Sequence, residues 1–123
     1  MDNAKFYKSV LDMDRAPVVL CDLNHTIIYM NDAAIENYKK YGGEKLIGQN
    51  LLNCHNEKSC EMINKVIDWF KKDKNNNLVH TFKNTKLNKD VYMVALRDGE
   101  TLIGYYEKHE FRDSETMKMY DID

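Results

Sequence analysis

Hydrophobic residues near the start of the chain recur at helical spacing and then change to the denser pattern of strands. Four of them predict an amphipathic helix from about Ala4 to Met13: Phe6, Val10, Leu11 and Met13. The only proline, Pro17, stops this helix. Residues 17–22 and 26–31 are short runs rich in β-branched and other apolar residues, and the turn-forming Leu23-Asn24-His25 between them indicates a β-hairpin.

The middle of the chain returns to helical spacing. Asn31 or Asp32 can cap a helix of about three turns, which Gly42-Gly43 ends by permitting positive φ. Its apolar residues are Ala34, Ile35, Tyr38 and Tyr41. After a short segment at 44–49, residues 59–72 form the strongest predicted helix. Its apolar residues recur three and four positions apart, which predicts that it covers a sheet: Met62, Ile63, Val66, Ile67 and Phe70.

The last third of the chain is rich in β-forming residues. The runs 78–83, 90–97 and 101–111 are separated by Leu87-Asn88-Lys89 and Asp98-Gly99, which predicts an antiparallel meander. The chain therefore predicts an α+β fold: a five-stranded antiparallel sheet with helices inserted between strands 2 and 3, and an N-terminal flanking helix. One face of such a sheet packs against the helices and the other is available to a partner.

Length and charge restrict the classes of partner. A chain of 123 residues is expected to fold as one domain. The formal net charge is −2 with both signs dispersed, so we expect no nucleic-acid partner and no attachment to anionic membranes. No apolar run approaches the roughly 18 to 20 residues that span a bilayer. Three cysteines without a C-x-x-C pair, and no apolar signal region, favour a reducing cytoplasm.

Two thiols and an imidazole lie at the entrance of the predicted 59–72 helix: Cys54, His55 and Cys60. His55 could coordinate haem iron or another metal, alone or together with Cys54, or Cys54 could be a thiolate activated by His55 and the helix N-terminus. The alternative is structural. Asn53, Asn56 or Ser59 then caps the helix, Cys54 packs as a small hydrophobic residue, and His55 donates one hydrogen bond. A Cys54–Cys60 disulfide is a further redox hypothesis.

Other residues suggest a pocket less directly. His80 is centred in a predicted strand on the same face as Leu78 and Phe82, as a pocket ligand or a structural histidine. Aromatic residues and a methionine either line a ligand cavity or simply favour strands: Tyr92, Met93, Tyr105 and Tyr106. His25 and His109 suggest no role. No enzyme template fits, because the five glycines are scattered and the Cys54-His55 pair lacks a third orienting group.

Several separated motifs resemble the PAS domain family, over about residues 12–113. Residues 27–34 (Ile-Ile-Tyr-Met-Asn-Asp-Ala-Ala) are similar to the second strand and following helix of that family, and 46–51 (Leu-Ile-Gly-Gln-Asn-Leu) to a recurrent segment. Asn53-Cys54-His55 with Lys58-Ser59, followed by segments 95–98 and 103–107, resembles a bacterial subgroup of stand-alone PAS domains with a Cys-His motif before the long helix.

The resemblance implies a non-catalytic sensory and protein-interaction module of bacterial signal transduction or transcriptional regulation. Such a module holds a small ligand, or none, between the sheet and the helices. We expect a PAS domain at 14–113, flanked by the helix at 1–13 and an acidic tail at 114–123. Candidate ligand contacts are Tyr38, Cys54, His55, Ser59, His80, Met93 and Tyr105.

The resemblance also implies a way of signalling. We expect a homodimer through Phe6, Val10 and Leu11, and an unidentified signalling protein in trans. One departure from the family concerns output: residues 110–114 (Glu-Phe-Arg-Asp-Ser) replace the Asp-Ile-Thr motif that usually leads to a signalling helix. Haem is a candidate cofactor. Flavin is not expected, because residues 53–56 lack the rest of the photosensor segment Asn-Cys-Arg-Phe-Leu-Gln.

Overall fold

The computed structural model describes residues 2–123 and confirms the predicted α+β architecture. The elements in chain order are α1 (Asn3–Met13), β1 (Val18–Asp22), β2 (Ile27–Met30), α2 (Asp32–Asn37), the 3-10 turns η1 (Lys39–Tyr41), η2 (Gly43–Leu46) and η3 (Leu51–Cys54), α3 (Glu57–Lys72), β3 (Leu78–Asn84), β4 (Lys89–Asp98) and β5 (Thr101–Phe111). None of the helices in this described part is long and apolar enough to cross a membrane.

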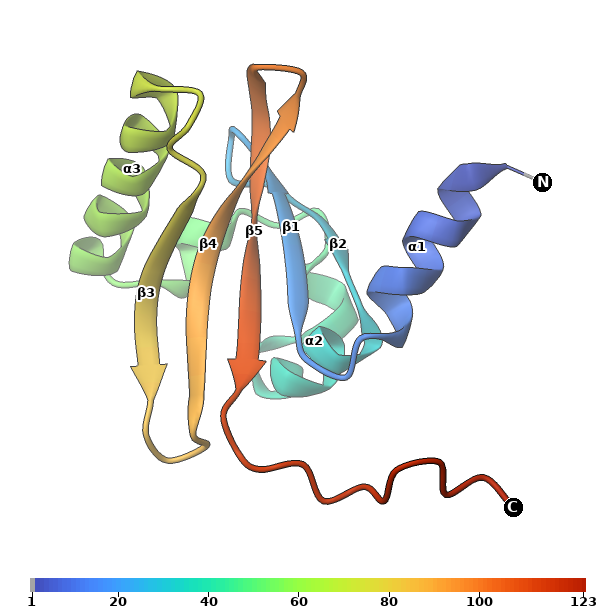
Figure 1. Cartoon of the computed structure of the whole chain (residues 1–123). Coiled ribbons are helices and arrows are strands. Elements are labelled where there is room, and N and C mark those ends of the chain that lie inside the picture. Colours follow the sequence, from blue (N-terminus) through green and yellow to red (C-terminus); the bar gives the residue numbers. More distant parts are fainter. Residues whose placement is uncertain (1) are drawn as a thin grey trace.

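The five strands form one antiparallel sheet in the order β2-β1-β5-β4-β3. The N-terminal hairpin β1–β2 and the C-terminal meander β3–β4–β5 therefore meet where β1 lies beside β5. Figure 1 shows α2 and the 3-10 turns behind the sheet and α1 projecting away from it beside β2. The connection from β2 to β3 thus carries the short helices and α3 over one face, which is called the inner face below.

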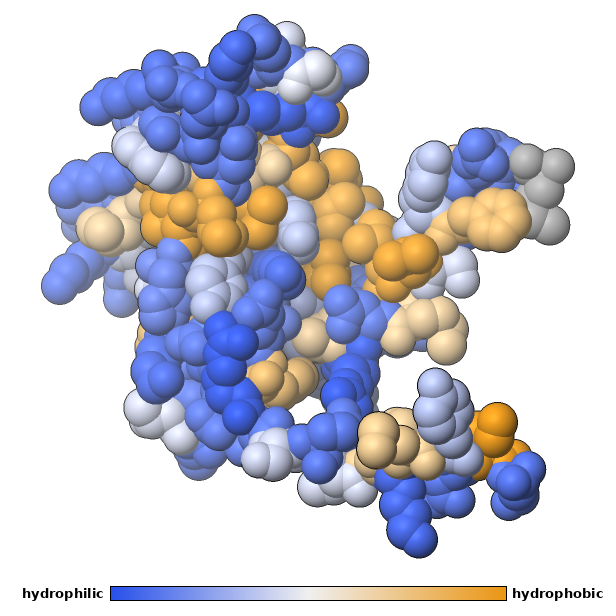
Figure 2. Space-filling model, in the orientation of Figure 1, coloured by the Kyte–Doolittle hydropathy of each residue, from blue (hydrophilic) through white to orange (hydrophobic). Residues whose placement is uncertain are grey.

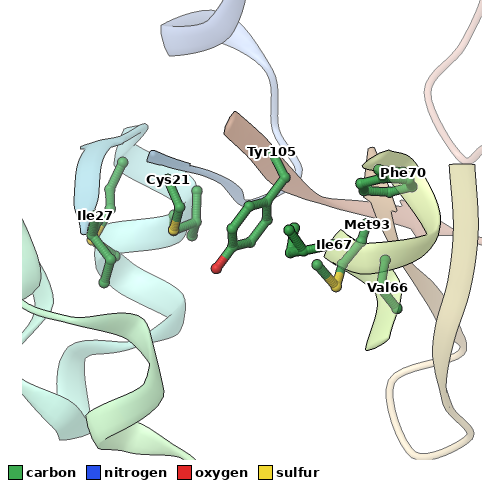
Figure 3. Close-up of a cluster of buried hydrophobic side chains, with 10 residues drawn as sticks. Cys21, Ile27, Val66, Ile67, Phe70, Met93 and Tyr105 are labelled. Carbon is green, nitrogen blue, oxygen red and sulfur yellow. The ribbon is translucent and has the colours of Figure 1, made fainter. Parts of the chain in front are cut away.

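The core lies between the inner face and the helices, because strand residues alternate between the two faces of a sheet. Strand residues of the core are Val19, Cys21, Ile27, Met30, Met93 and Tyr105, and the helices add Ala34, Val66, Ile67 and Phe70. In Figure 3 the ring of Tyr105 lies between Cys21 on one side and Ile67 and Met93 on the other. Tyr105 is only 1% exposed. Its ring therefore connects the part of the core around β1 with the part around α3 and β4.

Asn31 connects four elements at the end of β2. Its Oδ1 accepts hydrogen bonds from the backbone N–H of Val18 (3.0 Å) and of Ala34 (2.9 Å), so it is the residue that caps α2. Its Nδ2 donates to the carbonyl oxygens of Leu11 (2.9 Å) and Ala16 (3.0 Å). The Asn31 amide is fully buried, and both its oxygen and its nitrogen are hydrogen-bonded. It therefore fixes the position of the end of α1 against the sheet.

The sequence predictions were wrong in detail at three places. The helix after β2 ends at Asn37, and Lys39–Tyr41 continue as a 3-10 turn, so the predicted three turns are interrupted. The long helix begins at Glu57 rather than at residue 59, because Asn56, one of the three predicted capping residues, accepts the hydrogen bond from the Ser59 N–H (2.8 Å). The strand register shifts between His80 and Phe82, so these two residues do not keep the simple alternation that would place them on one face.

Candidate ligand-binding cleft

A cleft of about 590 Å³ opens on the inner face where α3 leaves β3, β4 and β5 uncovered. Its walls come from the end of α2, the first turns of α3 and the inner face of the three strands. Apolar residues supply much of the lining: Leu51, Met62, Ile63, Val66, Val79, Phe82, Leu87, Val91 and Met93. Most of the remaining lining is polar: Asn37, Tyr38, His55, Lys58, Ser59, Thr81, Asn84, Lys89, Glu107 and His109. An apolar hollow with several convergent polar groups is typical of small-molecule sites.

The structure brings most of the predicted contact residues to this cleft. Six of the seven line it: Tyr38, His55, Ser59, His80, Met93 and Tyr105. Cys54 does not; its side chain is exposed, and it lines a smaller adjoining hollow of about 240 Å³ that shares Tyr38, His55 and Glu107 with the main cleft. The residues therefore lie where a ligand would contact them, and their role in binding stays a prediction.

His55 follows η3 and lies between the two hollows. Its Nδ1 lies 2.9 Å from the carbonyl oxygen of Leu51, the hydrogen bond expected of a structural histidine. A donor at Nδ1 leaves Nε2 as the nitrogen with a free lone pair. The neighbouring Cys60 has a structural role instead, because its Sγ lies 3.4 Å from the carbonyl oxygen of Leu52. Cys54 and Cys60 are both free thiols, so the pair forms no disulfide here.

Glu107 is the charged centre of the cleft floor. It lies on β5 two residues after Tyr105 and accepts a short hydrogen bond from the hydroxyl of Tyr38 and one from His109 Nε2 (2.7 Å). Burial favours the neutral acid, but the hydrogen bonds from His109 and Tyr38 outweigh it and hold the pKa of Glu107 below its usual value. Burial, followed by the Glu107 carboxylate, raises the pKa of Tyr38, so Tyr38 stays a neutral donor.

Lys89 and His109 complete the polar floor. Lys89 starts β4, is 4% exposed, and its Nζ lies 3.4 Å from Asn37 Oδ1. Burial lowers the pKa of Lys89, an effect that the charge of Glu107 partly offsets. His109 is 5% exposed, and its Nδ1 is buried without a hydrogen-bond partner among the described residues. Buried polar atoms are nearly always paired, so this unpaired nitrogen needs an explanation.

Tyr105 is held by a residue to which the sequence assigned no role. Nδ1 of His25, in the turn between β1 and β2, lies 2.8 Å from the Tyr105 hydroxyl, and its Nε2 lies 3.1 Å from Asn64 Oδ1 on α3. His25 adopts a positive φ of 66° in that turn. The histidine therefore ties the β1–β2 hairpin to β5 through Tyr105 and to α3 through Asn64, and it fixes one wall of the cleft.

His80 lies at the rim of the cleft rather than inside it. Its Nε2 is 2.9 Å from Asp90 Oδ1, and its ring packs on Tyr92 at a centroid distance of 5.1 Å. Asp90 also accepts from Arg112 Nε at 2.8 Å. These contacts hold the imidazole against Asp90 and Tyr92 on the outer face. His80 is therefore a weaker candidate for a ligand contact than the residues inside the cleft.

Sequence reasoning missed the three polar residues of the floor, yet a signal for them existed. Tyr105, Glu107 and His109 alternate along β5, and Lys89, Val91 and Met93 alternate along β4. Because alternate residues share a face, the choice of Tyr105 and Met93 as cavity residues implied the same face for the others. His109 was assigned no role, although it lies on the same face of the predicted strand as Tyr105.

The comparisons with known proteins agree with this geometry. Residues 15–106 match the family described as "PAS domain". The chain belongs to the PAS domain family. A comparison with curated proteins found no match.

Three solved structures share the fold of this chain. The C-terminal domain of a protein from Streptococcus mutans superposes with a TM-score of 0.67 at 21% identity, over 88% of this chain and 84% of that one. A PAS domain from Colwellia psychrerythraea gives 0.65 at 19% identity, over 90% and 98%. A sensory box sensor histidine kinase from Vibrio cholerae gives 0.58 at 11% identity, over 87% and 90%. At these identities the likeness describes the PAS fold alone.

Proposed function

We propose that this PAS domain is a non-catalytic sensory module that binds a small molecule in the cleft between its sheet and α3. The observation that carries the proposal is the convergence of Tyr38, Lys89, Glu107 and His109 on the floor of an otherwise largely apolar cleft. A volume of about 590 Å³ is within the range of roughly 300 to 1,000 Å³ of small-molecule sites. Binding there would change the packing of α3 on the sheet, which is a route for a signal.

The floor supports binding better than catalysis. Glu107 already receives hydrogen bonds from Tyr38 and His109, so its carboxylate is engaged in the floor of the cleft rather than free to act as a base. None of the three free thiols lines the main cleft, and Cys54 is exposed outside it. The residues are therefore suited to hold and orient a ligand. We place the chain, on its Asn53-Cys54-His55 motif, with bacterial PAS domains of signal transduction or transcriptional regulation.

The proposal is tested by nuclear magnetic resonance of the ¹⁵N-labelled full chain titrated with a set of small soluble compounds. We expect shifts concentrated in the backbone amides of the cleft lining, with those of Val91, Met93 and Glu107 among the largest. The outer-face residues Leu20 and Val94 report non-specific effects. The proposal would be overturned if no compound in the set shifted the amides of the cleft more than the amides of the outer face.

We propose a haem sensor as the second candidate, because one observation favours it. Histidine ligands of metals usually donate their other ring N–H to a carbonyl or carboxylate, as His55 does to Leu51. Haem bound at His55 Nε2 would give a coloured protein with an intense visible absorption band, and His55→Ala would abolish that band. A colourless protein after haem-supplemented expression contradicts this candidate and leaves the small-molecule proposal standing.

We propose that the domain forms a homodimer through α1 and the outer face of the sheet, with a partner protein receiving the signal in trans. One apolar row crosses all five strands in register on the outer face: Leu78, Val94, Tyr106, Leu20 and Tyr29. Figure 2 shows hydrophobic side chains gathered in a band across this face and reaching toward α1. No residue of α1 is buried, and Phe6, Val10 and Met13 are exposed.

The row and α1 are continuous. Lys8 of α1 lies 5.7 Å from the centroid of the Tyr29 ring, so the helix adjoins the β2 end of the row. The exposed apolar side of α1 and the apolar row together form one apolar surface. Such a surface can bind a second copy of itself, because a two-fold axis brings the same patch of both chains together.

A further inference from the structure

Lys89 is a buried cation without a counterion. Its side chain is almost completely enclosed, yet its ammonium group forms no ion pair with any carboxylate of residues 2–123. Its polar contact is the long hydrogen bond to Asn37 Oδ1, and its charge lies 5.6 Å from the centroid of the Phe111 ring. A buried charge is costly unless it is paired, so an anion that enters the cleft would gain the unused N–H donors of Lys89 and stabilise its charged form.

His109 supplies a second unpaired group on the same floor. Its Nε2 is used by Glu107, whereas Nδ1 is buried and unpartnered. Since the Glu107 pKa favours the carboxylate, Nε2 carries a proton, and Nδ1 is free to accept a hydrogen bond from a neutral ring or donate one from a charged ring.

The sheet register brings the two residues together. Val91 pairs with His109 and Lys89 pairs with Phe111, so Lys89 and His109 are diagonal neighbours on β4 and β5 and face the same side. Both line the cleft. The other titratable groups of that lining are Tyr38 from the end of α2, His55 and Lys58 beside the start of α3, His80 from β3 and Glu107 from β5. Among them only Glu107 is an acid, and His109 and Tyr38 already occupy it.

We propose, resting on the small-molecule function proposed above, that the ligand of the cleft is a small monocarboxylic acid whose carboxylate binds between Lys89 Nζ and His109 Nδ1. The carboxylate of the ligand supplies the ion-pair partner that Lys89 lacks. It also accepts hydrogen bonds from the N–H groups of both residues. In this arrangement the two ring nitrogens of His109 face two carboxylates, Nε2 that of Glu107 and Nδ1 that of the ligand. The apolar body of the acid then lies against Val66, Val91 and Met93.

The charges of the floor disfavour other ligand classes. An amine would place a second cation beside Lys89, and a neutral alcohol would leave the ammonium uncompensated. A dianionic phosphate would place two negative charges next to the Glu107 carboxylate, where a monocarboxylate places one. The apolar walls favour a ligand with a hydrocarbon or aromatic body over a short polar acid.

Three probes of nearly equal shape test the inference on the full chain: 3-phenylpropionate, 3-phenylpropanol and 3-phenylpropylamine. Each is titrated into ¹⁵N-labelled protein at neutral pH, and the shifts of amides in the cleft give its dissociation constant. We expect the carboxylate to bind at least about tenfold more tightly than the alcohol and the amine, as a buried charge pair requires. The comparison uses the native chain, so it stands even if a variant fails to fold.

Two variants test whether Lys89 and His109 cause the preference for the carboxylate probe. Lys89→Met keeps the length of the side chain and removes its charge, so it should bind carboxylate and alcohol equally. The matched control Lys86→Met changes an exposed lysine in the β3–β4 turn and should keep the full preference. His109→Gln should reduce the preference in part.

The outcomes separate the two proposals. Equal binding of all three probes in the cleft, or a carboxylate preference that survives Lys89→Met, overturns the inference and leaves the sensory pocket intact. No binding of any probe in the cleft counts against this inference, and it counts against the pocket as well only if the broader compound set also gives no shifts there.

Discussion

Arg97 connects the end of α3 to the sheet through a single guanidinium group. It lies on the inner face of β4 and donates to the carbonyl oxygen of Phe70 (2.7 Å), to Asn77 Oδ1 (2.6 Å) and to the carbonyl oxygen of Glu100 (3.0 Å). Carbonyl groups at the end of a helix lack partners within the helix, and a cation there also suits the helix dipole. One side chain thus fixes the α3–β3 connection and, with it, the angle of α3 over the cleft.

Replacing Arg97 should destabilise the fold strongly. We expect Arg97→Met to lower the free energy of unfolding by about 2–3 kcal/mol, because several hydrogen bonds to a charged group are lost and carbonyl oxygens are left unpaired. Urea unfolding followed by circular dichroism measures this. Lys72→Met, at an exposed position of α3, is the control and should change stability by less than about 0.5 kcal/mol. Equal effects of the two substitutions would show that the Arg97 contacts are not stabilising.

Asp90 should make stability dependent on acid pH. The hydrogen bond from Arg112, with further help from Lys83 and His80, holds the pKa of Asp90 below its usual value. A carboxyl group whose pKa is lower in the folded state stabilises above its unfolded pKa, about 3.9, and loses this effect as the pH falls through the folded value. We therefore expect the stability difference between the native chain and Asp90→Asn to shrink between about pH 5 and about pH 3. A difference that is constant over this range, measured by urea unfolding, would contradict the assignment.

At the scale of elements, the start of α3 positions His55 and Ser59 at the mouth of the cleft. Asn56 caps the helix through its bond to the Ser59 N–H. We expect Asn56→Ala to lower the free energy of unfolding by about 1 kcal/mol. Asn53→Ala replaces an exposed asparagine of η3 only three residues away and should have almost no effect. A reversed order of the two variants in thermal unfolding would mean that the helix is capped differently in solution.

The elements were predictable where hydrophobic periodicity is strong. The apolar residues of α3 and the alternation in β4 and β5 predicted their type and order correctly. Boundaries failed where one hydrogen bond decides them: Asn56 starts α3 two residues before the predicted position, and the helix after β2 ends at Asn37. Hydrophobic periodicity does not report which of several nearby polar residues makes the hydrogen bond that caps a helix.

The cleft was predictable in part for the same reason. Tyr105 and Met93 looked like cavity residues because they are large and lie in strands. Lys89 was assigned to the turn before the predicted strand, and Glu107 and His109 were assigned no role. Polar side chains usually face water, so the pattern did not indicate that these three lie on the inner face. They are tolerated on the inner face because Tyr38 and Asn37 reach them from α2 and its C-cap, and that contact depends on tertiary structure.

At the scale of the whole molecule, the outer face should set the oligomeric state. We expect light scattering at high micromolar concentration to give a dimer for the native chain and a monomer for the double variant Phe6→Glu, Val10→Glu, because carboxylates would be buried in the interface. Lys5→Glu changes the net charge by the same amount on the same helix and should leave the dimer unchanged. A monomeric native chain at this concentration would remove the proposed dimer, without affecting the cleft.

The claim that the cleft of this PAS domain holds a small molecule is tested most directly by native mass spectrometry of freshly purified protein. Val79→Trp places an indole in the cleft, whereas Leu78→Trp adds the same side chain on the opposite face of β3. We predict an added mass, released on denaturation, in the native chain and in Leu78→Trp, and its absence in Val79→Trp. A bare polypeptide mass for the native chain, or the same added mass in all three proteins, would contradict the account.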